Sequence, residues 1–203
     1  MSGPMRALWA LTLAILVTGA IGISAALYFN ASGKNPPYPT AETPFGAPFV
    51  LTDHNGEAVS EAIFRGRPAA VMFGFTSCPD ICPATLAEMD SWSKALGSAG
   101  KDLRFVFVSV DPERDTPAVL KDYLSTFDVP VIGITGEPKA VADMLSSHHI
   151  HHEKVSLDHG GHTMDHTASV LLLDARGHLA GTISPGEDRD NALAKLRRLV
   201  GER

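Results

Sequence analysis

The chain has 203 residues, of which 44% are hydrophobic and 20% are charged, as expected for one globular domain with a sizeable core and some additional sequence. Its formal net charge is −6 at pH 7, and no basic stripe or run suggests a nucleic-acid partner. This acidic balance also argues against a surface of anionic lipids as the partner of the domain. Protein or metal partners fit the composition better.

The additional sequence lies at the N-terminus. Residues 7–29 carry no charged side chain, and this run is long enough to cross a bilayer core, which needs about 20 residues. We therefore predict a membrane anchor in residues 1–29. The alternative is a cleavable signal peptide with its site near Ser24, and it is disfavoured because its apolar region usually has only about 7 to 15 residues. Arg6 precedes the run, so the positive-inside rule places the domain in the periplasm, at the bacterial inner membrane.

Residues 30–44 read NASGKNPPYPTAETP and are rich in Pro, Ser, Thr and Ala. This composition predicts an extended, solvated tether. Residues 45–203 are then predicted to form one domain.

Strands and helices alternate along this domain. Short apolar runs without a helical period indicate buried strands, and Thr116 followed by Pro117 is typical of a helix start. The predicted elements are, in chain order, strand 69–75, helix 83–96, strand 103–110, helix 116–127, strand 129–136, helix 137–148, strand 167–174, strand 178–184 and helix 188–199. The alternation predicts parallel crossovers, followed by an antiparallel hairpin and a covering helix. This is the order of a thioredoxin-like α/β domain.

The only two cysteines, Cys78 and Cys82, lie between the first predicted strand and the first helix. Cys78 should sit at the carboxyl end of the sheet, where open α/β folds bind their ligands. Cys82 follows four residues later, near the first helical turn, so both sulfurs should face one side. The amides of a helix N-terminus lower the pKa of a thiol and favour the thiolate, which binds metals and attacks disulfides.

Three uses of the cysteine pair remain open at this point. Dedicated thioredoxin-like reductases separate their cysteines by two residues, whereas this chain has three between them. A static disulfide is disfavoured because a domain of this size needs no staple and the closed loop is very short. A metal site would need a third ligand, most commonly imidazole. His166, just before a predicted strand, is the candidate, and its alternative role is that of a solvent-exposed loop histidine.

Three separated stretches carry a family resemblance. They are FGFTSCPDICP (73–83), VSVDPERDTP (108–117) and DHTASVLLLD (165–174). With the N-terminal anchor and the thioredoxin-like order, they resemble the Sco/SenC copper proteins, which assist assembly of cytochrome c oxidase. The resemblance covers nearly the whole chain.

The resemblance implies copper bound by Cys78, Cys82 and His166. It also implies that the protein delivers copper to the binuclear copper centre of cytochrome c oxidase subunit II, or reduces the cysteines of that centre. Two thiolates and one imidazole suit three-coordinate Cu(I) and remain usable for Cu(II). Another periplasmic copper chaperone or a thiol reductant is a further expected partner.

Two neighbouring features have expected roles outside the ligand set. Asp165 is expected either to orient His166 or to act in a cap or loop. Residues 108–117 have a structural explanation, in which Arg114 and Asp115 brace the turn between a strand and a helix, without a role in catalysis.

Residues 148–162, HHIHHEKVSLDHGGH, contain six histidines, an enrichment that is not part of the resemblance. Such a tract can collect Cu(II), Ni(II) or Zn(II), or it can be a polar surface loop. We expect it to be irregular and to sample many conformations. His159 and His162 lie close to His166 in sequence and are therefore rival third ligands.

The main hypothesis is a metallochaperone that is not an enzyme. The alternatives are a membrane-tethered thiol-disulfide oxidoreductase or peroxide-handling enzyme, and a redox or copper sensor. His166 separates them, because copper transfer needs it and simple dithiol exchange does not.

Overall fold

The computed structural model describes residues 45–201. The predicted anchor, residues 1–29, and the predicted tether, residues 30–44, lie outside the described residues. Within residues 45–201, no helix is long and apolar enough to cross a membrane. The anchor therefore stays a prediction.

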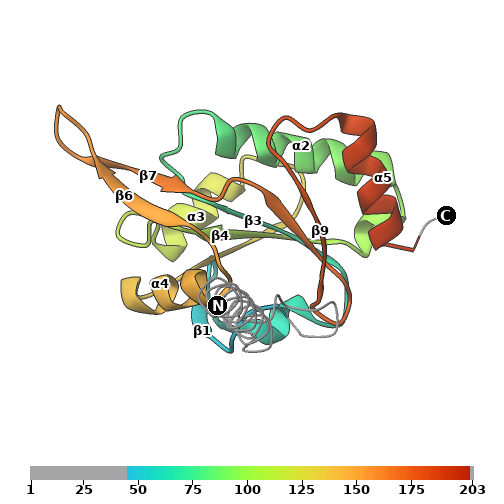
Figure 1. The fold of residues 1–203 in the computed structure, drawn as a ribbon, viewed down its shortest axis with the longest axis horizontal. Coiled ribbons are helices and arrows are strands. Elements are labelled where there is room, and N and C mark those ends of the chain that lie inside the picture. The colour runs from blue at the N-terminus through green and yellow to red at the C-terminus, as the bar shows by residue number, and fades with distance from the viewer. Residues whose placement is uncertain (1–44, 202–203) are drawn as a thin grey trace, which may run out of the picture. The chain divides into compact units, whose positions relative to one another are not determined.

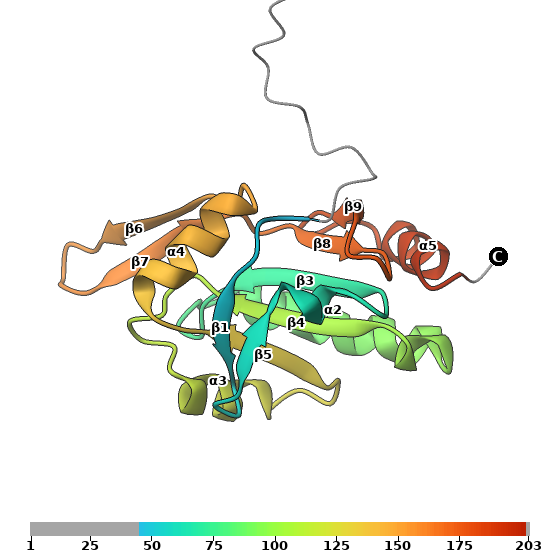
Figure 2. The same ribbon diagram turned by 90° about the horizontal axis from the view of Figure 1, so that it is seen from below.

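The domain is built on a seven-stranded sheet with the order β2-β1-β5-β4-β3-β8-β9 (Figures 1 and 2). The pairs β3–β4 and β4–β5 are parallel, whereas β8 runs antiparallel to both β3 and β9. The strands of this sheet are β1 (Val50–Asp53), β2 (Ala58–Ser60), β3 (Ala69–Gly74), β4 (Arg104–Ser109), β5 (Val131–Thr135), β8 (Val170–Leu173) and β9 (Leu179–Ile183). The predicted parallel crossovers and the closing hairpin are confirmed.

Helices cover both faces of the sheet. They are α2 (Ile81–Leu96), α3 (Pro117–Leu124), α4 (Pro138–Ser147) and α5 (Arg189–Leu199), with short 3₁₀ turns η1 (Glu61–Phe64) and η2 (Ala99–Lys101). Every residue of β3 is buried, and its side chains alternate between two core clusters. Met72 packs in the cluster that contains α2, α3 and α5, whereas Phe73 packs in the cluster that contains α4. A strand buried on both faces explains why its sequence shows an uninterrupted apolar run.

Two helix boundaries differ from the prediction. Helix α2 begins at Ile81, before the predicted start at Pro83, because proline is tolerated in a first turn, where its missing N–H would lack a helical partner. Helix α3 ends at Leu124 rather than at residue 127. The residues after Leu124 form a tighter turn, in which the Phe127 N–H donates to the Leu124 carbonyl. The N-terminal boundary at Thr116 is confirmed, since its side chain accepts a hydrogen bond from the Val119 N–H at 3.3 Å.

The His-rich segment is not irregular, so this prediction is wrong. Strands β6 (His152–Ser156) and β7 (His162–His166) form a separate antiparallel hairpin, with His152 opposite His166. Gly160 and Gly161 make its turn with φ angles of 85° and 82°, a conformation that glycine adopts readily. Both views show the hairpin extending beyond the main sheet at the end opposite α5 (Figures 1 and 2).

Two further features were missed by the sequence reasoning. Strands β1 and β2 add an antiparallel edge to β5, in a region for which no element was predicted. His148, counted above with the polar tract, is buried at the end of α4, and its ring centroid lies 4.7 Å from that of Phe45. It is therefore a core residue of the domain.

Candidate metal centre

The two cysteines lie where the chain passes from β3 into α2. The Cys78 N–H donates to the Phe75 carbonyl at 3.1 Å, which closes a turn directly after the strand. Cys82 is in the first turn of α2 and is only 1% exposed, whereas Cys78 is partly exposed and packs against both core clusters. Both are free thiols. The predicted position of the pair, at the carboxyl end of the sheet, is confirmed.

The Cys82 sulfur lies against the backbone of β3. A Cβ atom placed on Gly74 would be 2.6 Å from Cys82 Sγ and 3.2 Å from a ring carbon of Phe107. Both separations are shorter than ordinary van der Waals contact. Glycine at position 74 therefore makes room for this thiol.

Burial is the main cause that raises the pKa of the Cys82 thiol to about 12, and the nearby Cys78 acts in the same direction. The prediction that the helix N-terminus lowers the pKa is therefore wrong for Cys82. Removing a thiolate from water disfavours its charge more than the helix amides favour it. In the metal-free reduced protein Cys82 is protonated at neutral pH, and a bound metal has to displace this proton.

His166 is the last residue of β7 and is half-buried. Its ring meets the Phe75 ring edge-on, with centroids 5.8 Å apart and planes at 90°. Its Nδ1 lies 3.0 Å from the Thr167 carbonyl oxygen, which can only accept, so Nδ1 carries the proton. In the neutral ring the Nε2 lone pair is then the one that can bind a metal.

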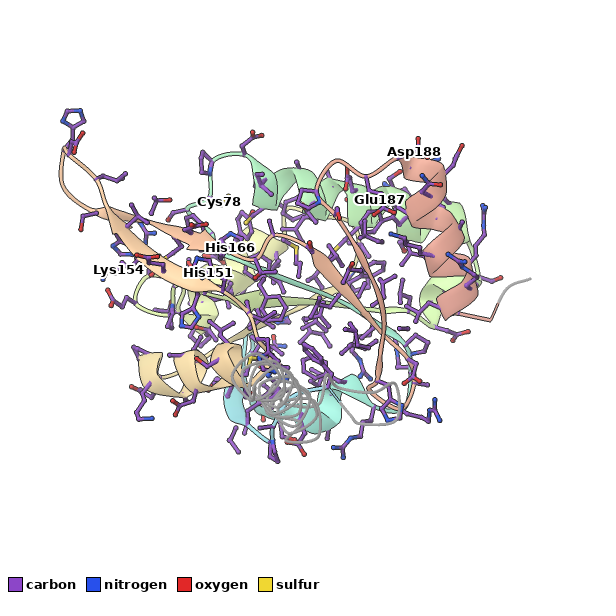
Figure 3. All side chains as sticks on the ribbon, in the orientation of Figure 1. Cys78, His151, Lys154, His166, Glu187 and Asp188 are labelled. Atoms are coloured by element: carbon purple, nitrogen blue, oxygen red, sulfur yellow. The ribbon has the colours of Figure 1, made fainter. Side chains whose placement is uncertain are left out.

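The three predicted ligands gather at one end of the sheet. Figure 3 shows Cys78 and His166 at the end from which the hairpin extends, and Phe75 links them through its ring and its carbonyl. In residues 45–201, however, no three His, Cys, Asp or Glu side chains are grouped tightly enough to hold a metal ion. A three-ligand site at this place therefore requires the side chains to move closer together.

Asp165 does not orient His166. Successive residues of a strand face opposite sides, and the Asp165 carboxylate lies on the exposed side, 3.6 Å from His151 Nε2. The Thr167 carbonyl makes the contact expected of Asp165.

The rival histidines have different surroundings. His162 Nε2 lies 3.1 Å from the Asp111 carboxylate, and His159 is exposed in the hairpin turn. The sequence reasoning missed the partnership between His162 and Asp111. In a strand, HTMDH puts His162 and His166 on one face but at opposite ends of the segment. This spacing is the signal that could have suggested different roles for the two histidines.

Asp115 ties the cysteine loop to the end of β4. Its fully buried carboxylate accepts hydrogen bonds from Thr76 Oγ1 at 2.6 Å, from the Thr76 N–H at 3.1 Å and from Ser109 Oγ at 2.7 Å. Burial nevertheless raises the pKa of this carboxyl, although the hydrogen bonds act in the opposite direction. The predicted bracing role of Asp115 is confirmed. Its carboxylate braces the turn after β4 through Ser109 and also holds the cysteine loop through Thr76.

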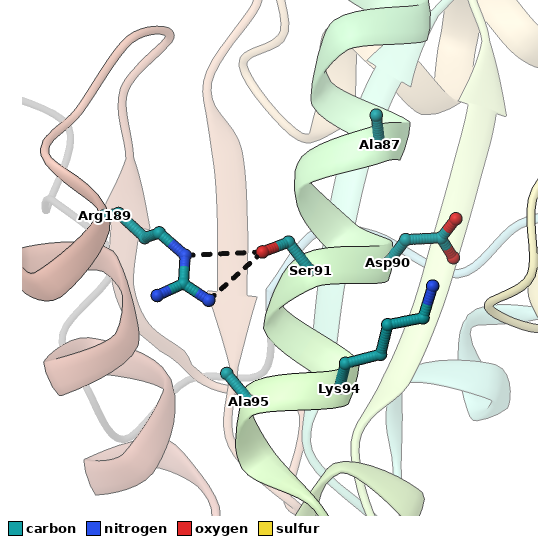
Figure 4. Close-up of a pocket in the computed structure, with 6 residues that line it drawn as sticks. All are labelled: Ala87, Asp90, Ser91, Lys94, Ala95 and Arg189. Atoms are coloured by element: carbon teal, nitrogen blue, oxygen red, sulfur yellow. Dashed lines mark hydrogen bonds between the residues drawn. The ribbon is translucent and has the colours of Figure 1, made fainter.

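A surface groove of about 550 Å³ lies elsewhere, between α2 and α5 (Figure 4). Its floor includes Ser91 Oγ, which accepts a hydrogen bond from the Arg189 guanidinium at 3.2 Å. The lining residues are Ala87, Asp90, Ser91, Lys94, Ala95 and Arg189. The groove offers neither thiol nor imidazole, so it does not share the ligand chemistry of the cysteine loop.

A thioredoxin-like sheet with a cysteine pair at its carboxyl end and an imidazole nearby offers ligands that suit soft metals, and its two thiols can also form a disulfide. The model of the SCO1/SenC family matches residues 38–201. The chain therefore belongs to the SCO1/SenC family.

Individual relatives agree with this assignment. A SCO2-like protein of Rickettsia conorii is 34% identical over 173 residues, which cover 80% of this chain and 84% of the relative. The structure of Bradyrhizobium japonicum ScoI with copper bound is similar with a TM-score of 0.70 and 40% identity, over 76% of this chain and 99% of that one. Yeast Sco1 with copper bound gives a TM-score of 0.70 and 29% identity, over 79% and 91% of the two chains.

Proposed function

We propose that the protein is a membrane-anchored copper chaperone that acts on the binuclear copper site of cytochrome c oxidase subunit II. It delivers copper to that site or reduces its cysteines. The observation that carries the proposal is the free thiol pair beside an imidazole whose Nδ1 is committed to the Thr167 carbonyl. Two relatives solved with copper bound support copper as the metal.

The proposed ligands are Cys78, Cys82 and His166. Two thiolates and one imidazole favour Cu(I) and also accommodate Cu(II), so both oxidation states are accessible to the same residues. Cys78 is partly exposed and Cys82 is buried. Cys78 is therefore the sulfur that a partner's thiolate can reach first when the metal is exchanged.

The proposed arrangement in the cell follows the sequence. Residues 1–29 anchor the chain in the bacterial inner membrane, residues 30–44 form the tether, and residues 45–203 form the copper-binding domain in the periplasm. An anchored domain and a membrane-bound oxidase meet in two dimensions, which raises their effective concentration.

Thiol-disulfide exchange is the second candidate function. It is favoured because the two sulfurs are close enough for Cys78 to raise the pKa of the Cys82 thiol. A reversible Cys78–Cys82 disulfide would consume both sulfur ligands and abolish copper binding. The same pair would then serve either as a metal site or as a source of two electrons.

Copper binding is tested by titrating the reduced chain in detergent with Cu(I) against a competing chelator. We expect one Cu(I) per chain, loss of this equivalent in Cys78→Ser and in Cys82→Ser, and weaker binding in His166→Ala. A stoichiometry that Cys82→Ser leaves unchanged would contradict the ligand assignment.

Delivery and reduction are separated in cells by measuring the copper occupancy of oxidase subunit II. If the protein delivers copper, occupancy should fall both in His166→Ala and in the double Cys→Ser variant. If it only reduces the partner's cysteines, occupancy should fall in the double variant alone.

A further inference from the structure

Strand β7 carries two histidines on one face, and the structure treats them differently. His162 and His166 are four residues apart, so in a strand both point to the same side. The His166 ring packs on Phe75 beside the cysteine loop. The His162 ring instead donates through Nε2 to the Asp111 carboxylate, at 3.1 Å from Oδ1 and 3.2 Å from Oδ2.

The contact between His162 and Asp111 is well shielded from water. The side chains of His162 and Asp111 are only 13% and 3% exposed. A carboxylate removed from water to this degree needs its hydrogen bonds, because an unpaired buried charge is strongly unfavourable. The Asp111 N–H is bonded in turn to Ser109 Oγ at 3.0 Å, so the aspartate itself is fixed to the end of β4.

Arg114 completes this arrangement. Its Nε donates to Asp111, and its Nη1 donates to the His162 carbonyl oxygen at 3.0 Å. Its guanidinium carbon also lies 5.8 Å from the centre of the Phe75 ring, against which His166 packs. We refer to Asp111, Arg114 and His162 together as the Asp111 clasp.

We propose that the Asp111 clasp fixes the β6–β7 hairpin on the domain and thereby sets the position of His166 relative to the two cysteines. His162 is then a positioning residue and not a copper ligand. This inference rests on the proposed function, because it concerns the geometry of the same site.

The hairpin needs such an attachment. It is a two-stranded sheet outside the main sheet, and isolated hairpins are at best marginally stable in water. Met164 supplies apolar contact with the α4 cluster. The ion pair between Lys154 and Glu113 is exposed on both sides, with side-chain exposures of 47% and 55%, so it contributes little. The clasp is the buried polar connection between the hairpin and the domain.

Strand geometry also separates His162 from the cysteines. Residues four apart in a strand are about 13 Å apart along its axis. An ion next to His166 therefore lies well beyond the reach of His162 while β7 keeps its structure. A role as third ligand would require breaking both the strand and the clasp.

The test uses the full-length chain in detergent and two substitutions at position 162. His162→Ala removes the clasp, whereas in His162→Gln the amide nitrogen can still donate to Asp111, although glutamine is a poor copper ligand. His159→Ala is the matched control, because His159 is an exposed histidine of the same hairpin. The measurements are the affinity for the first equivalent of Cu(II) and the thiolate-to-copper absorption band, with circular dichroism to verify folding.

We expect His162→Ala to weaken the first equivalent by about tenfold and to shift the absorption band, as is usual when a residue that orients a ligand is removed. His162→Gln should restore both properties, and His159→Ala should change neither. An affinity unchanged in a folded His162→Ala variant would overturn the inference. A folded His162→Gln variant that is as defective as a His166→Ala variant would also overturn it, because His162 would then act as a ligand.

The wild-type chain distinguishes failure of this inference from failure of the proposed function. If the wild type binds no copper that depends on Cys82, the proposed function fails. If it binds copper through Cys82 while a folded His162→Ala variant behaves like wild type, only the clasp inference fails. Should His162→Ala not fold, His162→Gln with native copper affinity supports the clasp, and His162→Gln with lost affinity contradicts it.

Discussion

The cysteine loop and the β6–β7 hairpin supply the proposed ligands, and they are attached to the domain by different forces. The cysteine loop continues a strand that is buried on both faces, and Cys82 itself is a core residue. The hairpin is mostly half-exposed or exposed and is joined to the domain by the Asp111 clasp and the packing of Met164. Burial positions the thiols, whereas hydrogen bonds position the imidazole.

This difference has a chemical consequence. The burial that places Cys82 also keeps its thiol protonated, so the sulfur is in position before it loses its proton and becomes charged. In His166 the Nδ1 proton is held by the Thr167 carbonyl, so Nε2 is the ring nitrogen available to bind a metal. Five predictions examine the contrast, from the largest expected effect to the smallest.

The reactivity of Cys82 should show the largest effect. With its pKa raised from 9.0 to about 12, the folded chain holds about a thousandfold less Cys82 thiolate at pH 8 than the unfolded chain. Alkylation with iodoacetamide, followed by mass spectrometry of peptides, should therefore modify Cys82 far more slowly in buffer than in urea. Equal rates in the two conditions would show that the thiol is not shielded.

The same shift sets a pH dependence of stability. Because the folded-state pKa is the higher one, the contribution of Cys82 to the free energy of unfolding is complete below pH 9 and is lost as the pH rises towards 12. Cys82→Ala should flatten this part of the pH profile in urea unfolding experiments.

Core packing under the cysteine loop should matter much more than side chains on the hairpin. Leu86, one turn after Cys82, is fully buried, so Leu86→Ala should lower the free energy of unfolding by about 2 to 5 kcal/mol. Val155 in β6 is 40% exposed, and Val155→Ala should change it by no more than about 0.5 kcal/mol. Urea unfolding of both variants measures the difference, and similar losses would contradict the contrast between the regions.

Gly74→Ala tests the contact between β3 and Cys82. The added methyl group would lie 2.6 Å from Cys82 Sγ, so the strand or the first turn of α2 has to shift. This shift should lower the free energy of unfolding by about 1 to 3 kcal/mol. Gly181→Ala is the control, since a Cβ at this β9 position meets nothing within 4 Å. Thermal unfolding should show a clear loss only for Gly74→Ala, with a parallel loss of Cu(I) affinity.

The smallest effect is expected at Thr135, the last residue of β5. Its hydroxyl is buried and has no hydrogen-bond partner among the described residues. Thr135→Val keeps the shape and removes the unsatisfied group, which should stabilise the protein by about 1 kcal/mol. The copper titration should stay as in the wild type, and a loss of stability would show that the hydroxyl has a partner.

The sequence alone determined the central part of the fold. The apolar runs at 69–75, 103–110 and 167–174 correspond to β3, β4 and β8 with small differences at their ends. A strand buried on both faces has to be apolar throughout, so its position is visible without any knowledge of its neighbours. For the same reason the cysteine pair could be placed at the carboxyl end of the sheet.

Tertiary structure decided the hairpin and the properties of individual groups. The segments HEKVS and HTMDH are too polar to be recognised as strands from the sequence. They form strands because they pair with each other and pack on a domain that is formed by other parts of the chain. The raised pKa of Cys82 depends on burial. The bond between His162 and Asp111 joins residues 51 positions apart. Local patterns determine which residues enter the core, whereas water exclusion and long-range partners, which exist only after folding, determine the protonation and orientation of each side chain.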